Sequence, residues 1–449
     1  MEKEKNGKTG FLKGAAWIAL GGFIAKLIGA VYRIPLTNLI GGHGLGLYQL
    51  VYPVYCLLLT VSATGIPSSI SKMTAEKIGK GESDRPLFKT AMLLFLLIGG
   101  VGSILMALLA PLLARAQGSE SVLNGYYALA PSVFLVSAIS VFRGWFQGRN
   151  EMCPTAMSEI TEQAVKVGFG LLFAYLYRSN VEKAVVFLLL SVSISELVAL
   201  LLMIFLYKKR KKKGQETQKD GGRVAMKSIL RLSIPVTFSS ILLPLSSLLD
   251  SVLVPKMLGA YAADPIALFG LFSGGAVTII NLPVSVCYGI AAASVPAVSA
   301  AAAKRALEKE NAPSVRKRIF FSLLITLLIS IPSAVALYFF ASPVVKIIFR
   351  SLQGEERETL IRLVRIFSLS AVTLSCTQTL SACLTAQGRP IKAAQAMLIA
   401  IVVKTVVYLF LLQKPEISVF GMAYATNVCY LVAFLLDLLY NLRVRGQGT

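Results

Sequence analysis

Residues 184–207 read AVVFLLLSVSISELVALLLMIFLY, and the basic run KKRKKK follows directly at 208–213. The first stretch has Glu196 as its only charged side chain, and about 20 apolar residues are enough for a helix to cross the hydrocarbon core of a bilayer. A block of Lys and Arg directly after such a stretch is typical of the cytoplasmic end of a transmembrane helix. These residues therefore predict a membrane-spanning helix that ends in the cytoplasm.

The rest of the chain has the same character. Of its 449 residues, 55% are hydrophobic and only 15% are charged, which excludes an ordinary soluble domain. The formal net charge of +23 lies in short blocks between apolar runs and not on one basic surface, so we expect no nucleic-acid partner. The six cysteines show no CxxC spacing, and we predict neither a disulfide framework nor a zinc site.

We predict an all-α integral membrane protein with about twelve transmembrane helices in two pseudo-symmetric six-helix lobes. The expected domains are an N-terminal lobe at 1–207, a basic cytoplasmic linker at 208–223 and a C-terminal lobe at 224–449. The twelve apolar segments lie near 11–39, 45–71, 88–113, 122–147, 155–177, 184–207, 225–257, 266–302, 319–341, 361–386, 391–412 and 417–441.

The distribution of basic residues predicts the orientation. With the N-terminus inside, the cytoplasmic segments hold 31 of the 45 Lys and Arg residues, and an excess of this kind marks the cytoplasmic side. Both termini should therefore be cytoplasmic. The segment 343–365 mixes charged and apolar residues at helical spacing, which indicates either an amphipathic helix on the outer membrane surface or a short helical extension of the tenth span.

A short repeat relates the two halves. Gln147-Gly148-Arg149, followed by Ala156-Met157, recurs at an offset of 240 as Gln387-Gly388-Arg389, followed by Ala396-Met397. Both copies fall at the predicted cytoplasmic turn between the fourth and fifth spans of a half. Since each half has an even number of spans, both halves insert in the same sense, and we expect a substrate path between the lobes.

Charged residues inside the spans are the candidate site residues, because each costs roughly 2.5 to 3.5 kcal/mol at the centre of a membrane helix. In the first span, Gly22, Lys26, Gly29 and Arg33 follow at spacings of four, three and four, so they share one stripe. We predict that Lys26 and Arg33 line a cavity. The alternative is that their side chains extend to the membrane surface.

The fifth span has a charged face of its own. Glu159, Glu162 and Lys166 stand at i, i+3 and i+7, and we predict that they contribute to substrate binding. The alternative is that Glu162 and Lys166, four residues apart, form a self-neutralising pair that only makes insertion tolerable.

Three further groups of charged residues call for an explanation. Asp250 in the seventh span needs a partner, and Lys404 in the eleventh is the best candidate, so we hypothesise a bridge with a coupling or gating role. Glu196 is expected to be a buried or protonated carboxyl group. Arg143 and Asp437 lie near cytoplasmic ends, where solvated positions would explain them.

Enzymatic motifs are missing from the sequence. It contains no nucleophile elbow, phosphate-binding loop or zinc spacing, and its only histidine is His43. We therefore predict no catalytic residue, no metal site and no cofactor. Coupling to an ion gradient or to the membrane potential is an open alternative if the protein is a transporter.

The run from Lys26 to Lys77, with YRIPLTNLIGGHGLGLYQLVYPVYCLLLTVSATGIPSSISKMTAEK at its heart, resembles the opening of the stage V sporulation protein B-like flippases. These belong to the polysaccharide-transporter branch of the multidrug/oligosaccharidyl-lipid/polysaccharide exporter superfamily. The resemblance implies a V-shaped bundle that alternates between inward-open and outward-open states and moves an undecaprenyl-pyrophosphate saccharide, such as lipid II, outward.

In lipid II flippases a cationic cavity that involves the first span binds the pyrophosphate, and Lys26 and Arg33 fit that role here. Many relatives carry fourteen spans, of which the last two are associated with a groove for the lipid tail, whereas twelve are predicted here.

Two other functions remain open at this point. A multidrug and toxin exporter of the same superfamily would handle organic cations and should expose carboxylates, whereas the first span offers only Lys and Arg. A non-transporting scaffold for envelope assembly would gain nothing from deep charges on one stripe. We expect a monomer in the bacterial cytoplasmic membrane, with lipid-linked saccharide and membrane lipids as its partners.

Overall fold

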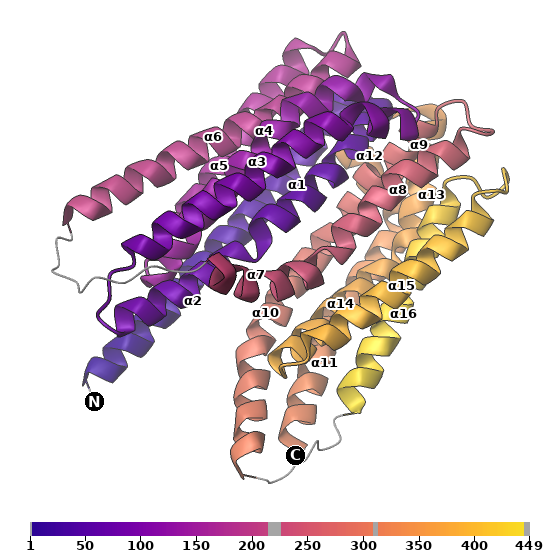
Figure 1. Ribbon diagram of the computed structural model, residues 1–449. Helices are drawn as coiled ribbons and strands as arrows, with labels where there is room; N and C mark the ends of the chain where they lie inside the picture. The colour runs from indigo at the N-terminus through magenta and orange to yellow at the C-terminus, as the bar shows by residue number, and fades with distance from the viewer. Residues whose placement is uncertain (1, 214–225, 309–312, 444–449) are drawn as a thin grey trace. The chain divides into compact units, whose positions relative to one another are not determined.

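The protein is helical throughout the part that its structure describes (Figure 1). The structure, a computed structural model, covers residues 2–213, 226–308 and 313–443, without the side chains of residues 2–27 and 30 and of some positions within 211–239 and 292–314. No β-strand occurs in these ranges. The predicted fold class, an all-α membrane protein, is confirmed.

Each of the twelve predicted segments falls in a helix or in a group of consecutive helices, and the first two share α1. In chain order the α-helices are α1 (Glu2–Leu59), α2 (Ile66–Gly79), α3 (Arg85–Ala116), α4 (Leu123–Gly148), α5 (Cys153–Leu176), α6 (Val181–Lys213), α7 (Met226–Ser240), α8 (Leu242–Leu258), α9 (Pro265–Gly270), α10 (Val277–Glu308), α11 (Pro313–Phe339), α12 (Ala341–Ile348), α13 (Gly354–Phe367), α14 (Leu369–Ala386), α15 (Pro390–Leu411) and α16 (Phe420–Leu442).

Among the described residues, eight helices are long and apolar enough to cross a membrane, or nine if α13 and α14 form one bent span. The sequence predicts more spans than this for three reasons. Most of the first predicted span lies before Val31, where most side chains are outside the described residues, the fifth span carries several charges, and the seventh is divided into α7 and α8. The chain is a multi-pass membrane protein.

The chain folds as two compact units. Unit 1 comprises Met1–Ile40 and Leu47–Val252, and unit 2 comprises Gly41–Gly46 and Leu253–Thr449. The boundary between the units therefore falls within α8. The predicted linker at 208–223 lies partly outside the described residues, and the division into two six-helix lobes stays a prediction.

The central helix of unit 1 is α4. Helices α2, α3 and α6 pack against it, and α4 is mostly buried whereas α3 is mostly exposed. Glycine permits close approach here, because a Cβ at Gly144 would lie 2.9 Å from the carbonyl oxygen of Pro67 in α2. Small residues at helix contacts are the usual basis of packing in lipid, where burial of apolar surface gives little advantage. Three serines of α4, Ser132, Ser137 and Ser140, are buried in this packing.

The two copies of the Gln-Gly-Arg repeat both lie at the end of a helix, α4 in unit 1 and α14 in unit 2. Their contacts differ. The Arg149 guanidinium pairs with the buried carboxylate of Asp84 at 2.8 Å, whereas Arg389 donates to the carbonyl oxygen of Tyr440 at 3.3 Å. The position of the repeat at a turn is as predicted, but the two arginines stabilise their turns in different ways.

In unit 2 the central helix is α14, against which α10, α11 and α16 pack. The segment predicted either as an amphipathic surface helix or as an extension of the tenth span forms two helices, α12 and α13. A bend of 46° separates α13 from α14. Helix α13 leads into α14, which agrees with a helical extension of the tenth span, while a position on the outer membrane surface stays a prediction.

The seventh predicted segment is interrupted at Ile241, between α7 and α8. Pro244 explains the break, since it has no N–H to donate to the carbonyl oxygen four residues earlier and its ring crowds that carbonyl. The interruption lies three residues before Pro244, within the turn that the proline disturbs.

Helix α1 contains a break at Gly41, where the backbone takes φ 68° and ψ −173°. This conformation is accessible to glycine and strained for other residues. The sequence predicts an outside loop at this point, but the chain resumes its helix directly after Gly41. Residues 41–46 pack within unit 2, where His43 Nδ1 lies 2.7 Å from the Asp264 carboxylate.

Gly46→Ala should destabilise unit 2. The new Cβ would lie 2.1 Å from the carbonyl oxygen of Ile266, which is backbone and cannot move aside as a side chain can. We expect a loss of about 1–3 kcal/mol, seen as a lower midpoint of thermal unfolding of the detergent-purified protein. Gly289→Ala in α10 is the matched control, since its Cβ would meet nothing within 4 Å, and it should leave the midpoint unchanged or raise it slightly. Equal midpoints for the two variants would contradict this close packing.

Candidate functional site

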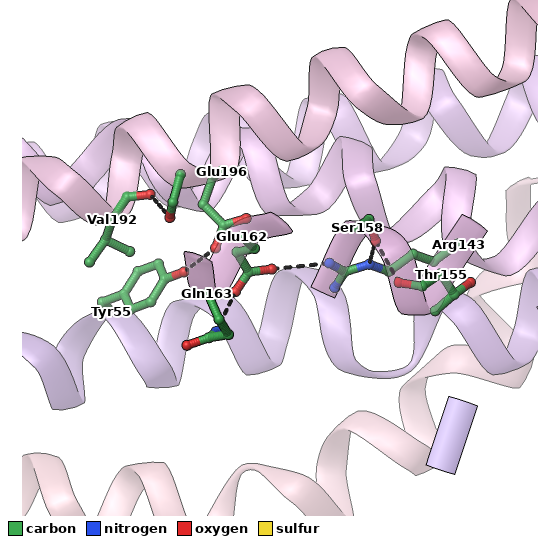
Figure 2. A network of polar contacts seen from close by, with 9 residues as sticks. Tyr55, Arg143, Thr155, Ser158, Glu162, Gln163, Val192 and Glu196 are labelled. Atoms are coloured by element: carbon green, nitrogen blue, oxygen red, sulfur yellow. Dashed lines mark hydrogen bonds and ion pairs between the residues drawn. The ribbon is translucent and has the colours of Figure 1, made fainter. Parts of the chain in front are cut away.

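The charged residues of unit 1 converge inside the bundle. The Arg143 guanidinium of α4 donates from Nη2 to Glu162 Oε2 of α5 at 3.0 Å, and its Nε donates to Ser158 Oγ at 2.9 Å (Figure 2). The Arg143 and Glu162 side chains are 15% and 17% exposed. An ion pair this well buried is held in one geometry, because breaking it would leave a charge without compensation.

Local structure explains how these residues meet. The chain turns between the end of α4 at Gly148 and the start of α5 at Cys153, so the two helices run in opposite directions. Arg143 lies five residues before the turn, and Ser158 lies five residues after the start of α5. The Ser158 hydroxyl in turn donates to the Thr155 carbonyl at 2.8 Å, which orients its oxygen toward the guanidinium.

A second carboxyl group extends this network toward α6. Glu196 is 3% exposed and accepts a hydrogen bond from Tyr55 Oη of α1 at 3.4 Å. The other oxygen of Glu162, Oε1, accepts from Gln163 Nε2 at 3.2 Å. Figure 2 shows these two sets of hydrogen bonds, and Glu162 interacts electrostatically with both Glu196 and Tyr55. The polar groups of α1, α4, α5 and α6 are therefore coupled by charge.

Two further cations lie within electrostatic range of this network. Lys166 of α5 interacts with Glu162, Glu196 and Arg33, while forming no salt bridge among the residues that the structure describes. Arg33 of α1 is half-buried and interacts with Tyr48. The site, which we call the charged cluster, consists of three cations and three carboxyl groups: Arg33, Arg143, Glu159, Glu162, Lys166 and Glu196.

The stripe predicted on the first span faces the charged cluster in part. A Cβ at Gly29 would lie 3.3 Å from Gln163 Oε1, and one at Gly170 would lie 2.1 Å from the Tyr32 hydroxyl. Helix α1 therefore packs closely along α5, with glycines at the points of contact. Lys26 lies within α1, one turn before Gly29, and its side chain is outside the described residues.

The structure brings together Arg33, Glu159, Glu162 and Lys166 from the predicted set. Their roles in substrate binding stay predictions. Glu162 forms its salt bridge with Arg143 and also interacts electrostatically with Lys166, so the alternative of a self-neutralising Glu162–Lys166 pair stays open. Asp250 belongs to unit 1 and Lys404, which is buried, to unit 2, and their pairing also stays a prediction.

Two charged residues were misjudged from the sequence. Arg143 was expected at a solvated helix end, but it is the ion-pair partner at the centre of the charged cluster. Asp437 was expected to be solvated as well, but it is 1% exposed and accepts a hydrogen bond from Ser381. Glu196 is buried, as predicted. The sequence signal that could have indicated burial was the presence of polar residues on the facing helices, such as Ser381 opposite Asp437.

Metal chemistry finds no support in the described part of the chain, where no group of three or more His, Cys, Asp or Glu side chains is arranged to hold an ion. The charged cluster instead offers guanidinium and ammonium groups within a membrane bundle. Such groups can bind an anionic ligand and be neutralised by carboxylates when it is absent.

Comparison with known structures supports a transporter fold. An inward-facing multidrug resistance MATE family transporter of the MOP superfamily superposes with a TM-score of 0.77 at 17% identity, covering 93% of each chain. The inward closed conformation of the lipid II flippase MurJ superposes with a TM-score of 0.70 at 15% identity, covering 94% of this chain and 87% of the other. At these identities the likeness establishes the fold alone.

Sequence relatives narrow the class. Stage V sporulation protein B of Bacillus subtilis (strain 168) is 27% identical, covering 93% of this chain and 81% of its own length. The lipid II flippase MurJ of the same organism is 23% identical, covering 97% of this chain and 83% of its own length. With the fold, these relatives place the chain among multi-pass membrane transporters and flippases, not among enzymes.

The family follows from a direct match. The model of the polysaccharide biosynthesis protein family matches residues 11–302, which is more than half of the sequence. The chain belongs to this family. The resemblance to stage V sporulation protein B-like flippases is confirmed.

Proposed function

We propose that the protein is a flippase that moves an undecaprenyl-pyrophosphate-linked saccharide, lipid II or a related oligosaccharide lipid, from the inner to the outer leaflet. It would do so by alternating access, for cell-wall or polysaccharide synthesis. Family membership and the named flippase among the relatives support this proposal. The observation that carries it is the gathering of Arg33, Arg143 and Lys166 inside one membrane bundle.

A pyrophosphate ligand would explain why these cations lie inside the bundle. Its oxygens accept strong charge-assisted hydrogen bonds, and attraction between opposite charges is much stronger in a membrane interior than in water. Glu159 and Glu162 would compensate the cations between transport cycles. Lys166, which forms no salt bridge with a described residue, would contact the pyrophosphate directly, together with Lys26 and Arg33 of α1.

Rescue of a bacterial strain depleted of its lipid II flippase is the test of this function. Expression of the protein should restore growth and cell-wall synthesis, whereas a vector control should not. Proteoliposomes carrying the purified protein should in addition move fluorescent lipid II to the opposite leaflet. Failure of both assays, together with reduced accumulation of organic cations by expressing cells, would favour a multidrug exporter. Failure in all three would favour an envelope scaffold.

The transport cycle should be coupled to an ion gradient or to the membrane potential, and we propose Asp250 and Lys404 as coupling or gating residues. If they pair, Asp250→Asn and Lys404→Gln should each impair transport, while the double variant recovers part of the loss. Rescue of growth of the flippase-depleted strain by each variant, at matched expression, measures this. Losses that simply add would show that the two residues act independently.

We propose a location in the bacterial cytoplasmic membrane with both termini in the cytoplasm. In a background without the native cysteines, thiols introduced within 40–44 and 352–356 should react with a membrane-impermeant maleimide added to intact cells. Thiols introduced within 210–220 should react only after the cells are opened. The opposite pattern would reverse the orientation, which rests on the excess of basic residues in the cytoplasmic segments.

A further inference from the structure

Unit 2 carries an apolar groove on its surface, between α11 and α16 and beside the junction of α13 and α14. Its volume is about 600 Å³. From α16 it is lined by Tyr424, Asn427, Val428 and Leu431, at i, i+3, i+4 and i+7. The groove therefore follows the helix axis over roughly 10 Å, in the direction of the lipid chains of a bilayer.

One charged side chain lines this groove, that of Arg365 in the last turn of α13. It forms no ion pair with any described residue. The other strongly polar lining group, the Asn427 amide, is already engaged, since it donates to the Ile366 carbonyl at 2.8 Å and accepts from Ser370. The Arg365 guanidinium is therefore the charged group of the groove that is available to bind a ligand.

The aromatic residues that line the groove indicate its depth in the membrane. Tyr338, near the end of α11, and Tyr424, near the start of α16, are each about half exposed and both line the groove. Tyrosines with one apolar side and a polar tip are enriched where hydrocarbon meets the lipid headgroups. Arg365 lines the groove together with these tyrosines. The next residue, Ile366, accepts a hydrogen bond from Asn427 of α16, which ties this part of α13 to α16.

We propose that this groove binds one acyl chain of an anionic membrane phospholipid, with the headgroup phosphate on the Arg365 guanidinium. The groove supplies an apolar channel parallel to the helices, and the guanidinium supplies planar, two-point recognition of phosphate. Its volume is that of a single-ligand site, which suits one acyl chain better than a much longer polyprenyl chain. This site is independent of the proposed flippase activity.

Native mass spectrometry of the detergent-purified protein tests the proposal. The wild-type protein, titrated with dioleoyl phosphatidylglycerol and separately with dioleoyl phosphatidylcholine, should retain one phosphatidylglycerol more tightly than the zwitterionic lipid. Arg365→Ala should weaken phosphatidylglycerol binding about tenfold, the effect of losing a charged hydrogen bond. It should weaken phosphatidylcholine binding less, because the choline cation partly neutralises the phosphate that both lipids carry. Val335→Trp, which fills the groove from α11, should weaken binding of both lipids.

Arg362→Ala is the matched control, because it removes the same charge from the same helix one turn earlier. Arg362 stacks on Phe420 at 4.5 Å and does not line the groove, so phosphatidylglycerol binding should stay at the wild-type level. An equal loss in both arginine variants would overturn the proposal in favour of general surface charge. A polyprenyl phosphate that bound more tightly than phosphatidylglycerol in an Arg365-dependent way, or a dimer in place of bound lipid, would overturn it as well.

Discussion

Arg143→Met is expected to destabilise unit 1 by about 3 kcal/mol, because it leaves the Glu162 carboxylate inside the bundle without its cation. This is the lower end of the range for breaking a buried pair, since both side chains keep some exposure to solvent. Glu162→Gln should cost less, because the guanidinium keeps its bond to Ser158. The free energy of unfolding of the purified protein, followed by thermal or denaturant unfolding in detergent, measures both effects.

The double variant Arg143→Met, Glu162→Gln separates the pair from its surroundings. If the two groups interact as the structure indicates, the double variant should be more stable than the sum of the single losses predicts, with a coupling energy of about 2 kcal/mol. Arg210→Met is the control, because Arg210 pairs with Glu151 in the same unit at a more exposed position and should cost less than about 1 kcal/mol. A coupling energy near zero would show that the ion pair does not contribute to the stability of unit 1.

The second large effect concerns the cations of α1. Lys26 and Arg33 lie seven residues apart, roughly 10 Å along the helix axis, so one pyrophosphate is expected to meet them in succession and not together. Lys26→Ala should abolish rescue of the flippase-depleted strain while leaving membrane insertion intact, since removal of a central charge makes insertion easier. Immunoblotting of membranes verifies matched expression, and Lys183→Ala at the exposed start of α6 is the control.

Arg33 allows charge and geometry to be separated. Arg33→Lys should do less harm than Arg33→Ala if charge alone matters, and equal harm if the fork of the guanidinium is needed for phosphate. Normal rescue by the double variant Lys26→Ala, Arg33→Ala would exclude these residues from transport. That result would still be compatible with the fold and with the family, which do not depend on the two side chains.

The helical architecture was predictable because hydropathy and length decide which segments enter a membrane. What the sequence could not supply were contacts between helices. Spacing along α5 correctly placed Glu162 and Lys166 on one face, but the stronger partner, Arg143, comes from α4, and pair rules within one helix cannot predict it. Residues 40–44 were expected as a loop because they separate the first two predicted spans. In the structure the helix continues past Gly41, and residues 41–46 belong to unit 2.

Asp437 is a second residue whose contacts with neighbouring helices could not be predicted from the sequence. The sequence shows that Asp437 lies near the end of a span, and this position suggested contact with water. Its lateral surroundings cannot be read in that way. The structure closes α14 over this carboxylate and supplies the Ser381 hydroxyl as a donor, so position along a span was a poor guide to exposure.

The pairing of Arg143 with Glu162 also constrains how the protein is made. Helix α5 is not apolar enough to pass as a span by itself, and during synthesis Arg143 leaves the ribosome nineteen residues before its partner. An isolated α4 would carry an uncompensated cation into lipid, and an isolated α5 would carry its carboxylates. We therefore expect the insertion machinery to hold α4 until α5 has emerged and to release the two as one hairpin. Biogenesis of this region then depends on the short turn between Gly148 and Cys153, which keeps the opposite charges within reach from the start.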